Sequence, residues 1–168
     1  MGFFDWLGLT GNGKALEMGD PAPDVATLDH AGNAVRLADF YGEGYTLVYF
    51  YPKADTFGCT IQACTLRDAF DELRIHGVRV VGVSTDRPEA QERFRGKYHL
   101  PFVLLADRER AVAKAFGVPI VLGMTRRQSF LIKDGKIVWR DLHASPRKQA
   151  ADVLQVVEKL GNATPGGS

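Results

Sequence analysis

The sequence predicts an α/β fold in which helices flank a mixed central β-sheet. Short apolar runs rich in β-branched and aromatic residues alternate with stretches of helical periodicity along most of the chain. The last two strand-like runs, at residues 129–132 and 136–140, are joined by Asp134-Gly135, a strong signal for a two-residue hairpin turn. Because helical crossovers join parallel strands and tight turns join antiparallel ones, this order requires a sheet of mixed direction.

The first half of the chain is expected to supply a hairpin and the first central strands. Residues 24–37 form the hairpin, with its turn at residues 31–33, and residues 38–42 form a short helical turn. The strongly apolar run at residues 45–50 predicts the first buried strand, and residues 78–83 predict the second. Residues 101–105 follow as a short strand.

Helical periodicity recurs after these strands. A helix is expected to begin near Pro88, with Asp86 or Thr85 as its N-cap and an inward face made of Ala90, Phe94 and Tyr98. Residues 109–116 predict another short helix.

The last helix is predicted after the second hairpin. Ser145-Pro146 should open it and Gly161 should end it. Its apolar stripe consists of Ala150, Val153, Leu154, Val157 and Leu160.

Composition narrows the class of protein. With 168 residues, 45% of them hydrophobic, the chain has the size and apolar content of one ordinary domain. The net charge is +1 with acidic and basic residues interleaved, which argues against nucleic acid as a partner. The apolar runs are strand-sized and no signal peptide is recognisable, so we expect a cytoplasmic protein without a membrane span. Two cysteines in a chain of this length do not form a secretory disulfide framework.

Three parts are expected along the chain: an N-terminal extension at residues 1–17, one domain at residues 18–160 and a flexible tail at residues 161–168. The extension concentrates large apolar side chains, namely Phe3, Phe4, Trp6 and Leu7. Either it docks on its own domain, which we favour, or it contacts a membrane surface or a partner.

Both cysteines lie where the strand at residues 45–50 gives way to a helix. Apolar side chains recur there at alternating steps of four and three residues, which is the spacing of one stripe of an α-helix. The stripe consists of Cys59, Ala63, Leu66, Phe70 and Leu73. Cys59 thus falls in the first helical turn, where unpaired N–H groups and the positive end of the helix dipole favour a thiolate. We therefore expect a lowered pKa for the Cys59 thiol and a sulfur partly shielded from water.

Cys64 lies five residues further on, about 140° around the helix and about 7.5 Å along its axis. The two Cα atoms are then about 8–9 Å apart, beyond the roughly 7 Å that a disulfide tolerates. The first turns of the helix must therefore unwind before the thiols can join. A reactive cysteine whose partner is reachable only by local unfolding is typical of redox chemistry.

The spacing Pro52-x-x-x-Thr56-x-x-Cys59 resembles the active-site motif of the peroxiredoxins. Its extension to Cys64, with Tyr-Pro-Lys before it and Cys-Thr-x-x-Ala-Cys at its end, resembles the Q-type subfamily, the bacterioferritin comigratory proteins. The resemblance spans about residues 18–160 and includes similar runs at residues 19–24, 98–102, 115–118 and 127–132. Phe57 departs from the pattern, because the subfamily has proline there, and we expect the first helical turn to fray more easily as a result.

The resemblance implies a thioredoxin-like fold and a thiol peroxidase that reduces hydrogen peroxide and organic hydroperoxides. It implies that Cys59 is the peroxidatic cysteine and that Cys64 resolves the Cys59 sulfenic acid by forming an intramolecular disulfide. A thioredoxin or similar dithiol would then reduce that disulfide. The subfamily contains monomers and some dimers, and we expect a monomer without a cofactor or a metal.

The resemblance also implies roles for the side chains around the thiol. Thr56 and Arg127 join the two cysteines as catalytic residues, and the substrate-binding residues are Pro52, Thr56, Gly58 and Arg127. Arg127 is preferred to its neighbour Arg126 because of the alignment to Phe130.

Alternatives remain open from the residues alone. Both cysteines could be inert thiols, Thr56 only a helix N-cap and Arg127 only a solvated residue. A redox sensor or a thiol–disulfide oxidoreductase on the same fold is the main functional alternative, although Cys-x4-Cys is not the Cys-x-x-Cys spacing of the latter class. A papain-like hydrolase would need a histidine beside Cys59, and zinc would need a four-ligand spacing that the two cysteines and four scattered histidines do not provide.

Overall fold

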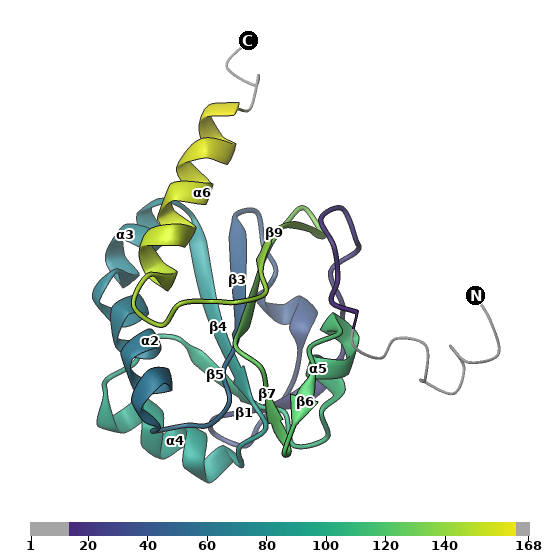
Figure 1. Ribbon diagram of the computed structural model, residues 1–168, viewed down its shortest axis with the longest axis vertical. Coiled ribbons are helices and arrows are strands. Elements are labelled where there is room, and N and C mark those ends of the chain that lie inside the picture. Colours follow the sequence, from purple (N-terminus) through teal and green to yellow (C-terminus); the bar gives the residue numbers. More distant parts are fainter. Residues whose placement is uncertain (1–13, 164–168) are drawn as a thin grey trace, which may run out of the picture.

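A computed structural model describes residues 14–163 and arranges them in three layers (Figure 1). The middle layer is a seven-stranded sheet with the spatial order β2 (Ala34–Arg36), β1 (Ala26–Asp29), β5 (Val103–Ala106), β4 (Val78–Ser84), β3 (Tyr45–Phe50), β8 (Gln128–Lys133) and β9 (Lys136–Asp141). One face is covered by the helices α2 (Phe57–Asp68), α3 (Phe70–Ile75), α4 (Pro88–Lys97) and α6 (Gln149–Ala163). The 3-10 helix η1 (Leu37–Phe40) and the short helix α5 (Ala111–Phe116) cover the other face.

The centre of the sheet shows its mixed direction. Strand β3 runs parallel to β4 and antiparallel to β8, so that Tyr49 lies opposite Gly82 on one side and Ser129 on the other. The pair β4–β5 is parallel, whereas the outer pairs β1–β5, β1–β2 and β8–β9 are antiparallel. The prediction of a mixed central sheet flanked by helices is confirmed.

Alternate side chains of β3 enter two different cores, because successive residues of a strand point to opposite faces. Leu47 and Tyr49, with Tyr51 just beyond the strand, pack in the core beneath α2, α4 and α6. Val48 and Phe50 pack in the core beneath α5. All five are fully buried, and burial on both faces explains why the run is continuously apolar rather than alternating.

The hairpin β8–β9 forms at the predicted turn. Asp134 and Gly135 both have positive φ, at 52° and 74°, as a type I′ turn requires. The hairpin returns the chain beside β3, where Gln128 pairs with Phe50. Arg127, directly before β8, is thereby brought to the end of β3 from which the cysteine loop departs.

Two local predictions about the helices on this face are wrong. The single helix expected after the cysteine loop is divided, because the chain leaves helical geometry at Ala69 (φ −94°, ψ 6°) between α2 and α3. The expected caps of α4 are also wrong, since Arg87 occupies the N-cap position. Asp86 instead accepts the N–H of Ala54 at 2.7 Å, and Thr85 donates to the carbonyl of Gly123 at 2.8 Å.

The bounds of α6 also differ from the prediction. Residues 145–148 form a turn in which Lys148 N–H donates to the Ser145 carbonyl, so α6 begins at Gln149. The helix continues past Gly161 to Ala163. The predicted inward stripe is nevertheless present, with Ala150, Val153 and Val157 buried and Leu154 and Leu160 half-buried. A small hairpin of β6 (Ile120–Val121) and β7 (Met124–Thr125) was not predicted.

The last residues of the expected extension pack against α5. Ala15 is buried, and the N–H of Leu16 donates to the carbonyl of Phe116 at 3.0 Å. Gly117 has a positive φ of 70° and lies so close that an added Cβ would collide with the Lys14 carbonyl. The apolar side chains expected to dock, at residues 3–7, and most of the expected tail lie outside the described residues.

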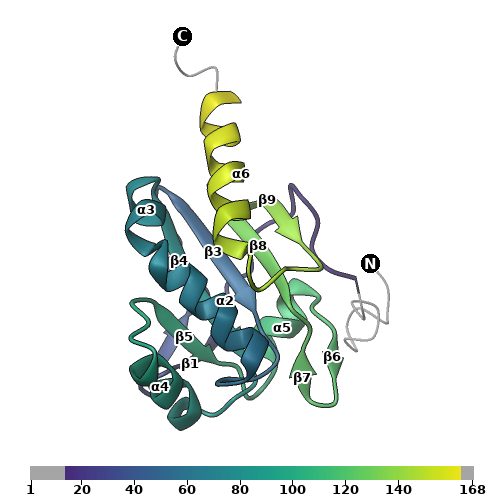
Figure 2. The same cartoon turned by 60° about the vertical axis from the view of Figure 1, so that its left-hand side comes forward.

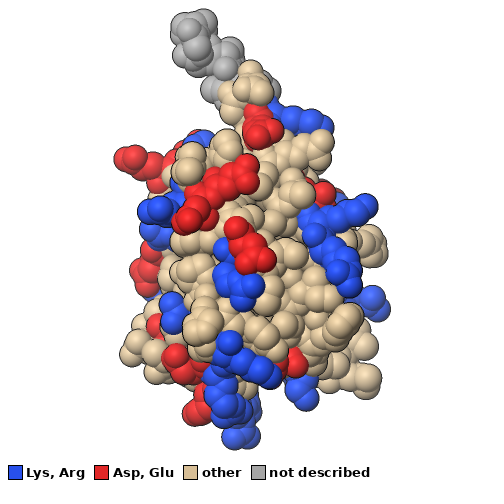
Figure 3. Space-filling view, turned by 90° about the vertical axis from the view of Figure 1, so that its left-hand side faces the viewer, with Lys and Arg blue, Asp and Glu red and all other residues tan. Residues whose placement is uncertain are grey.

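The helical side of the molecule carries interspersed charges. Figure 3 shows basic and acidic side chains side by side over this face, as expected for a net charge of +1. Within residues 14–163, no helix is long and apolar enough to cross a membrane. In Figure 2, α2 lies across the sheet with the first turns of α6 near it, an arrangement that matters for the site described next.

Candidate active site

Cys59 is the third residue of α2 and is buried, with 1% of its surface exposed. The loop from Tyr51 to Thr56 leads from the end of β3 into this helix, and Thr56 has the extended backbone of an N-cap residue (φ −95°, ψ 162°). A buried strand therefore delivers the thiol to the first turn of a helix of 12 residues, as predicted. The helix dipole favours negative charge at this position.

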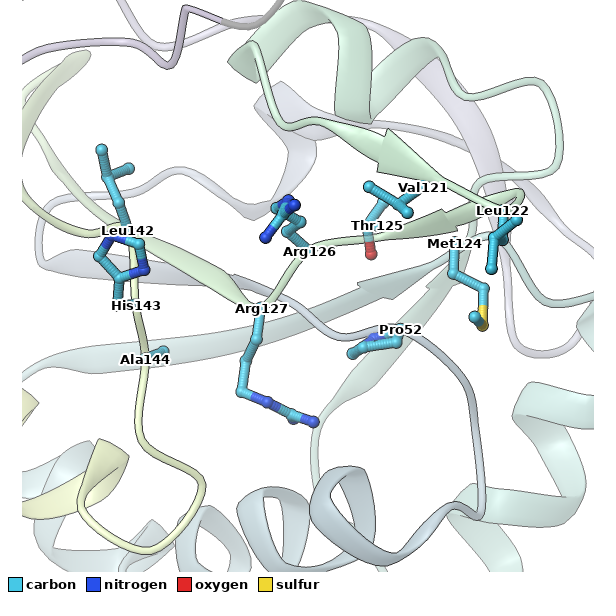
Figure 4. Close-up of a pocket in the computed structure, with 10 residues that line it drawn as sticks. All are labelled: Pro52, Val121, Leu122, Met124, Thr125, Arg126, Arg127, Leu142, His143 and Ala144. Carbon is cyan, nitrogen blue, oxygen red and sulfur yellow. The ribbon is translucent and has the colours of Figure 1, made fainter.

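The Arg127 guanidinium lies beside the thiol. Its Nη2 is 3.5 Å from Cys59 Sγ, and its Nη1 donates to Gln62 Oε1 at 2.6 Å. In Figure 4, Arg127 extends from the chain between β7 and β8 toward α2, whereas Arg126 lies on the other side of the backbone. Arg126 is exposed, and its N–H donates to the carbonyl of Pro119. Of the two adjacent arginines, Arg127 is the one that contacts the cysteine.

Gln62 connects Arg127 to a buried hydrogen-bond chain. The Gln62 amide donates through Nε2 to Gln149 Oε1 at 2.9 Å, and the Ser129 hydroxyl donates to the same oxygen. These three polar side chains are fully buried and come from α2, α6 and β8. No site role was predicted for any of them. The local signal for Gln62 is its place one helical turn after Cys59, whereas nothing in the sequence around Gln149 points to the site.

Two tyrosines of the core lie under the cysteine helix. Burial raises the pKa of the Tyr49 phenol well above its ordinary value, and negative charge on Cys59 raises it further. Burial also raises the pKa of Tyr51, whose hydroxyl donates to Gln91 at 2.6 Å. Both phenols therefore stay neutral, and negative charge near Cys59 must be balanced by the helix start and Arg127.

Carboxylates anchor the loop between β3 and α2 at two points, one just before α4 and one at the end of α4. The Asp86 carboxylate accepts a hydrogen bond from the N–H of Ala54. The Asp55 carboxylate accepts hydrogen bonds from Lys97 Nζ at 3.0 Å and from the Tyr98 hydroxyl at 2.9 Å. The hydrogen bonds from Lys97 and Tyr98 lower the pKa of the exposed Asp55 carboxyl. Asp55 also has a positive φ of 60°, which marks a sharp reversal of the chain. These contacts fix the loop that carries Thr56.

The Thr56 hydroxyl is committed to its own loop. It donates to the Lys53 carbonyl at 2.7 Å and, among the described residues, it neither caps α2 nor bonds the Cys59 sulfur. The side chain is exposed. With its proton engaged, the hydroxyl oxygen faces solvent as an acceptor only.

A pocket of about 480 Å³ opens beside these residues, and Figure 4 shows its lining. Pro52 and Arg127 border it on the side of the cysteine loop. The β6–β7 hairpin adds apolar side chains, of which Val121 and Leu122 are exposed. The pocket thus combines two arginines, Arg126 and Arg127, with an apolar wall.

Cys64 lies five residues after Cys59 on the same unbroken helix and is half-buried, and both cysteines are free thiols. The Cα atoms of Cys59 and Cys64 are therefore separated as expected for two residues five apart in an α-helix. Within the described part of the chain, no three His, Cys, Asp or Glu side chains come together as metal ligands would.

Comparisons with known proteins identify the family of the chain. The AhpC/TSA family model matches residues 18–140. Peroxiredoxin Bcp of Escherichia coli (strain K12) is 50% identical over 130 residues, which cover 73% of this chain and 83% of that protein.

Solved structures extend the likeness to the fold. The crystal structure of peroxidoxin BcpB from Mycobacterium tuberculosis matches with a TM-score of 0.81 at 30% identity, over 86% of this chain and 98% of that one. A second match is a Xanthomonas campestris bacterioferritin comigratory protein, solved as intermediate and ligand complexes that concern alkyl peroxide reduction. Its TM-score is 0.77 at 25% identity, and the match covers 88% of this chain and 99% of that one. The expected thioredoxin-like fold is confirmed by these matches. The chain belongs to the AhpC/TSA family and is a peroxiredoxin, a thiol peroxidase.

Proposed function

We propose that the Cys59 thiolate is the group that attacks the hydroperoxide. A sulfur–oxygen bond forms as the O–O bond breaks, the sulfur is oxidised to a sulfenic acid, and the released oxygen takes up a proton and leaves as water or an alcohol. The contact between Arg127 Nη2 and Cys59 Sγ carries this proposal. A guanidinium at this place stabilises both the thiolate and the negative charge that develops on the departing oxygen.

Thr56 and Arg127 divide the binding of the peroxide between them in this proposal. The Thr56 hydroxyl already donates to Lys53, so it accepts the O–H proton of the substrate. Arg127 donates to the peroxide oxygens. Pro52 borders the pocket, and Gly58 leaves space for the guanidinium.

Ionisation of the thiol alone cannot account for a fast peroxidase. An ordinary cysteine with a pKa of about 8.5 is already several per cent thiolate near neutral pH. Complete ionisation therefore gains only about 10- to 30-fold in rate, or about 1.4–2 kcal/mol. The larger share must come from alignment of the O–O bond and from donors to the leaving oxygen.

The sulfenic acid is resolved by Cys64 in our proposal. The Cys64 thiolate attacks the Cys59 sulfur, a disulfide forms and the sulfenic oxygen leaves as water. Because the helix holds the two Cα atoms about 8–9 Å apart, the first turns of α2 must unwind at this step. A dithiol, for which we propose thioredoxin or a similar protein, then reduces the disulfide by exchange.

The apolar wall beside Arg127 supports organic hydroperoxides as substrates in addition to hydrogen peroxide. The alkyl peroxide reduction attributed to the similar Xanthomonas campestris protein agrees with this range. We further propose that the protein is cytoplasmic, since two cysteines in a chain of this length do not form a secretory disulfide framework, and that it is a monomer, as members of the subfamily that it resembles can be.

Gly58→Ala should separate activity from stability. A Cβ at residue 58 would lie 3.0 Å from Arg127 Nη2, so the guanidinium must move by a few tenths of an ångström from its place beside the sulfur. We expect the rate constant with hydrogen peroxide to fall about tenfold, because small displacements of catalytic groups carry large rate penalties. The free energy of unfolding should change by less than about 1 kcal/mol, since alanine suits a helix better than glycine.

Gly96→Ala is the matched control for that variant. Gly96 is also helical, and no atom lies within 4 Å of the position that its Cβ would take. Stopped-flow peroxide kinetics and thermal unfolding of both variants provide the comparison. Equal rate constants for the two variants would show that the space at Gly58 does not matter for Arg127.

Sustained turnover tests the proposed cycle. NADPH consumption is followed with hydrogen peroxide, thioredoxin and thioredoxin reductase. We expect consumption to continue until one substrate is exhausted. A single burst of about one peroxide per protein would favour a redox sensor, or a reductant other than thioredoxin. The mass of the product separates these two outcomes, because a peroxidase that lacks its reductant stops at the Cys59–Cys64 disulfide, whereas a sensor without a resolving step stops at the Cys59 sulfenic acid.

A further inference from the structure

Four side chains from three parts of the chain, namely α2, the start of β8 and the start of α6, form one directed hydrogen-bond chain behind the thiol. Arg127 donates to Gln62 Oε1, Gln62 Nε2 donates to Gln149 Oε1, and the Ser129 hydroxyl donates to the same Gln149 oxygen. Gln62, Ser129 and Gln149 are fully buried. Only Arg127 contacts the sulfur, so the others can act on the reaction only through it.

The direction of each bond determines the next one. If the Gln62 amide turned over, its NH₂ group would face the guanidinium and its oxygen would face Gln149 Oε1, so both bonds would be lost. The oxygen of Gln149 opposes this by accepting from Gln62 Nε2, and the Ser129 hydroxyl donates to the same oxygen. An acceptor from α6 thus decides which atom Gln62 presents to Arg127.

In this arrangement the NH₂ group of Gln149 itself is left without an acceptor in the described part of the chain. Its Nε2 is buried and has no hydrogen-bond partner among residues 14–163. A buried donor without a partner is unfavourable and uncommon in folded proteins. An apolar side chain of similar size would fill the space without that penalty, so packing alone does not explain a glutamine here.

We propose that Gln149 and Ser129 are positioning residues of the active site, which hold the Arg127 guanidinium at the Cys59 sulfur through Gln62. The inference rests on the proposed roles of Cys59 and Arg127. It assigns the start of α6, 90 residues away from Cys59 along the chain (149 − 59), to the site. Neither residue touches the substrate.

A double-mutant cycle tests the proposal. Gln149→Met keeps the size of the side chain and removes the acceptor. We expect the rate constant of the reduced protein with hydrogen peroxide, measured by stopped flow, to fall about tenfold, as is typical when a supporting partner of a functional group is removed. In an Arg127→Met background the same change should alter the rate constant by less than about twofold, because a residue that acts only through Arg127 has nothing left to act on.

Controls distinguish the possible failures. Gln155→Met, on the exposed side of α6, should leave the rate constant unchanged. If Gln149→Met does not fold, Ser129→Ala enters the same cycle, with a smaller loss expected in the wild-type background only. A loss of equal size in both backgrounds, or none in either, would overturn the proposal for Gln149 and Ser129. An Arg127→Met protein as fast as the wild type would overturn the role of Arg127 itself and, with it, the positioning role of Gln149 and Ser129.

Discussion

Arg127→Met should slow the reaction of the reduced protein with hydrogen peroxide by about 10²-fold, even at an alkaline pH at which every accessible thiol is ionised. At that pH any difference in thiol ionisation between the variant and the wild type has disappeared. What it still lacks is the donor that binds the peroxide and stabilises the departing oxygen, and the guanidinium is placed 3.5 Å from the sulfur to provide it.

Arg126→Met is the matched control, because this exposed neighbour borders the same pocket without contacting the thiol. Its rate constant with hydrogen peroxide should stay within about twofold of the wild type, because Arg127 and not Arg126 contacts the sulfur. Rate constants are measured by stopped flow across the alkaline range. Convergence of Arg127→Met with the wild type at high pH would mean that the arginine acts only on thiol ionisation.

Cys64→Ser should abolish sustained turnover while leaving the first reaction intact. Cys64 is half-buried and away from the Arg127 contact, so the attack of Cys59 on the first equivalent of peroxide should proceed at the wild-type rate. Without a second thiol, the sulfenic acid cannot close a disulfide. It should persist and, in excess peroxide, pass to the sulfinic acid.

The rate of the first equivalent is the internal control for that variant, since a folding defect would slow it too. Two further measurements are made. One is turnover with thioredoxin, and the other is the mass of the peptides that contain Cys59 after treatment with excess peroxide. Undiminished turnover in Cys64→Ser, with no overoxidation, would show that the reductant attacks the sulfenic acid directly.

The parts of the fold that local chemistry determines could be predicted from the sequence. The run at residues 45–50 is buried on both faces and forms β3 with the predicted bounds. Asp134-Gly135 forms the type I′ turn that its residue types favour. The cysteine in the first turn of a helix followed from the strand, the loop and the helical stripe, and these depend only on neighbouring residues.

Features that depend on distant residues could not be predicted in this way. The break at Ala69 has no proline or glycine to mark it, and α6 starts at Gln149 although Ser145-Pro146 is a good local start signal. The partnership of Gln62 with Gln149 joins positions 87 residues apart, and it exists only because α2 and α6 pack on the same face of the sheet. Thr56 occupies the N-cap position, but its hydroxyl donates to the nearby Lys53 carbonyl and its oxygen accepts no N–H group of the first helical turn.

The two-cysteine cycle is tested most directly by treating the fully reduced protein with one equivalent of hydrogen peroxide in the absence of any reductant. Cys59 and Cys64 lie in one tryptic peptide, residues 54–67, between Lys53 and Arg67. We predict that both thiols disappear and that this peptide loses the mass of two hydrogen atoms. Loss of one thiol only, with a gain of one oxygen atom on Cys59 and a free Cys64, would contradict the account.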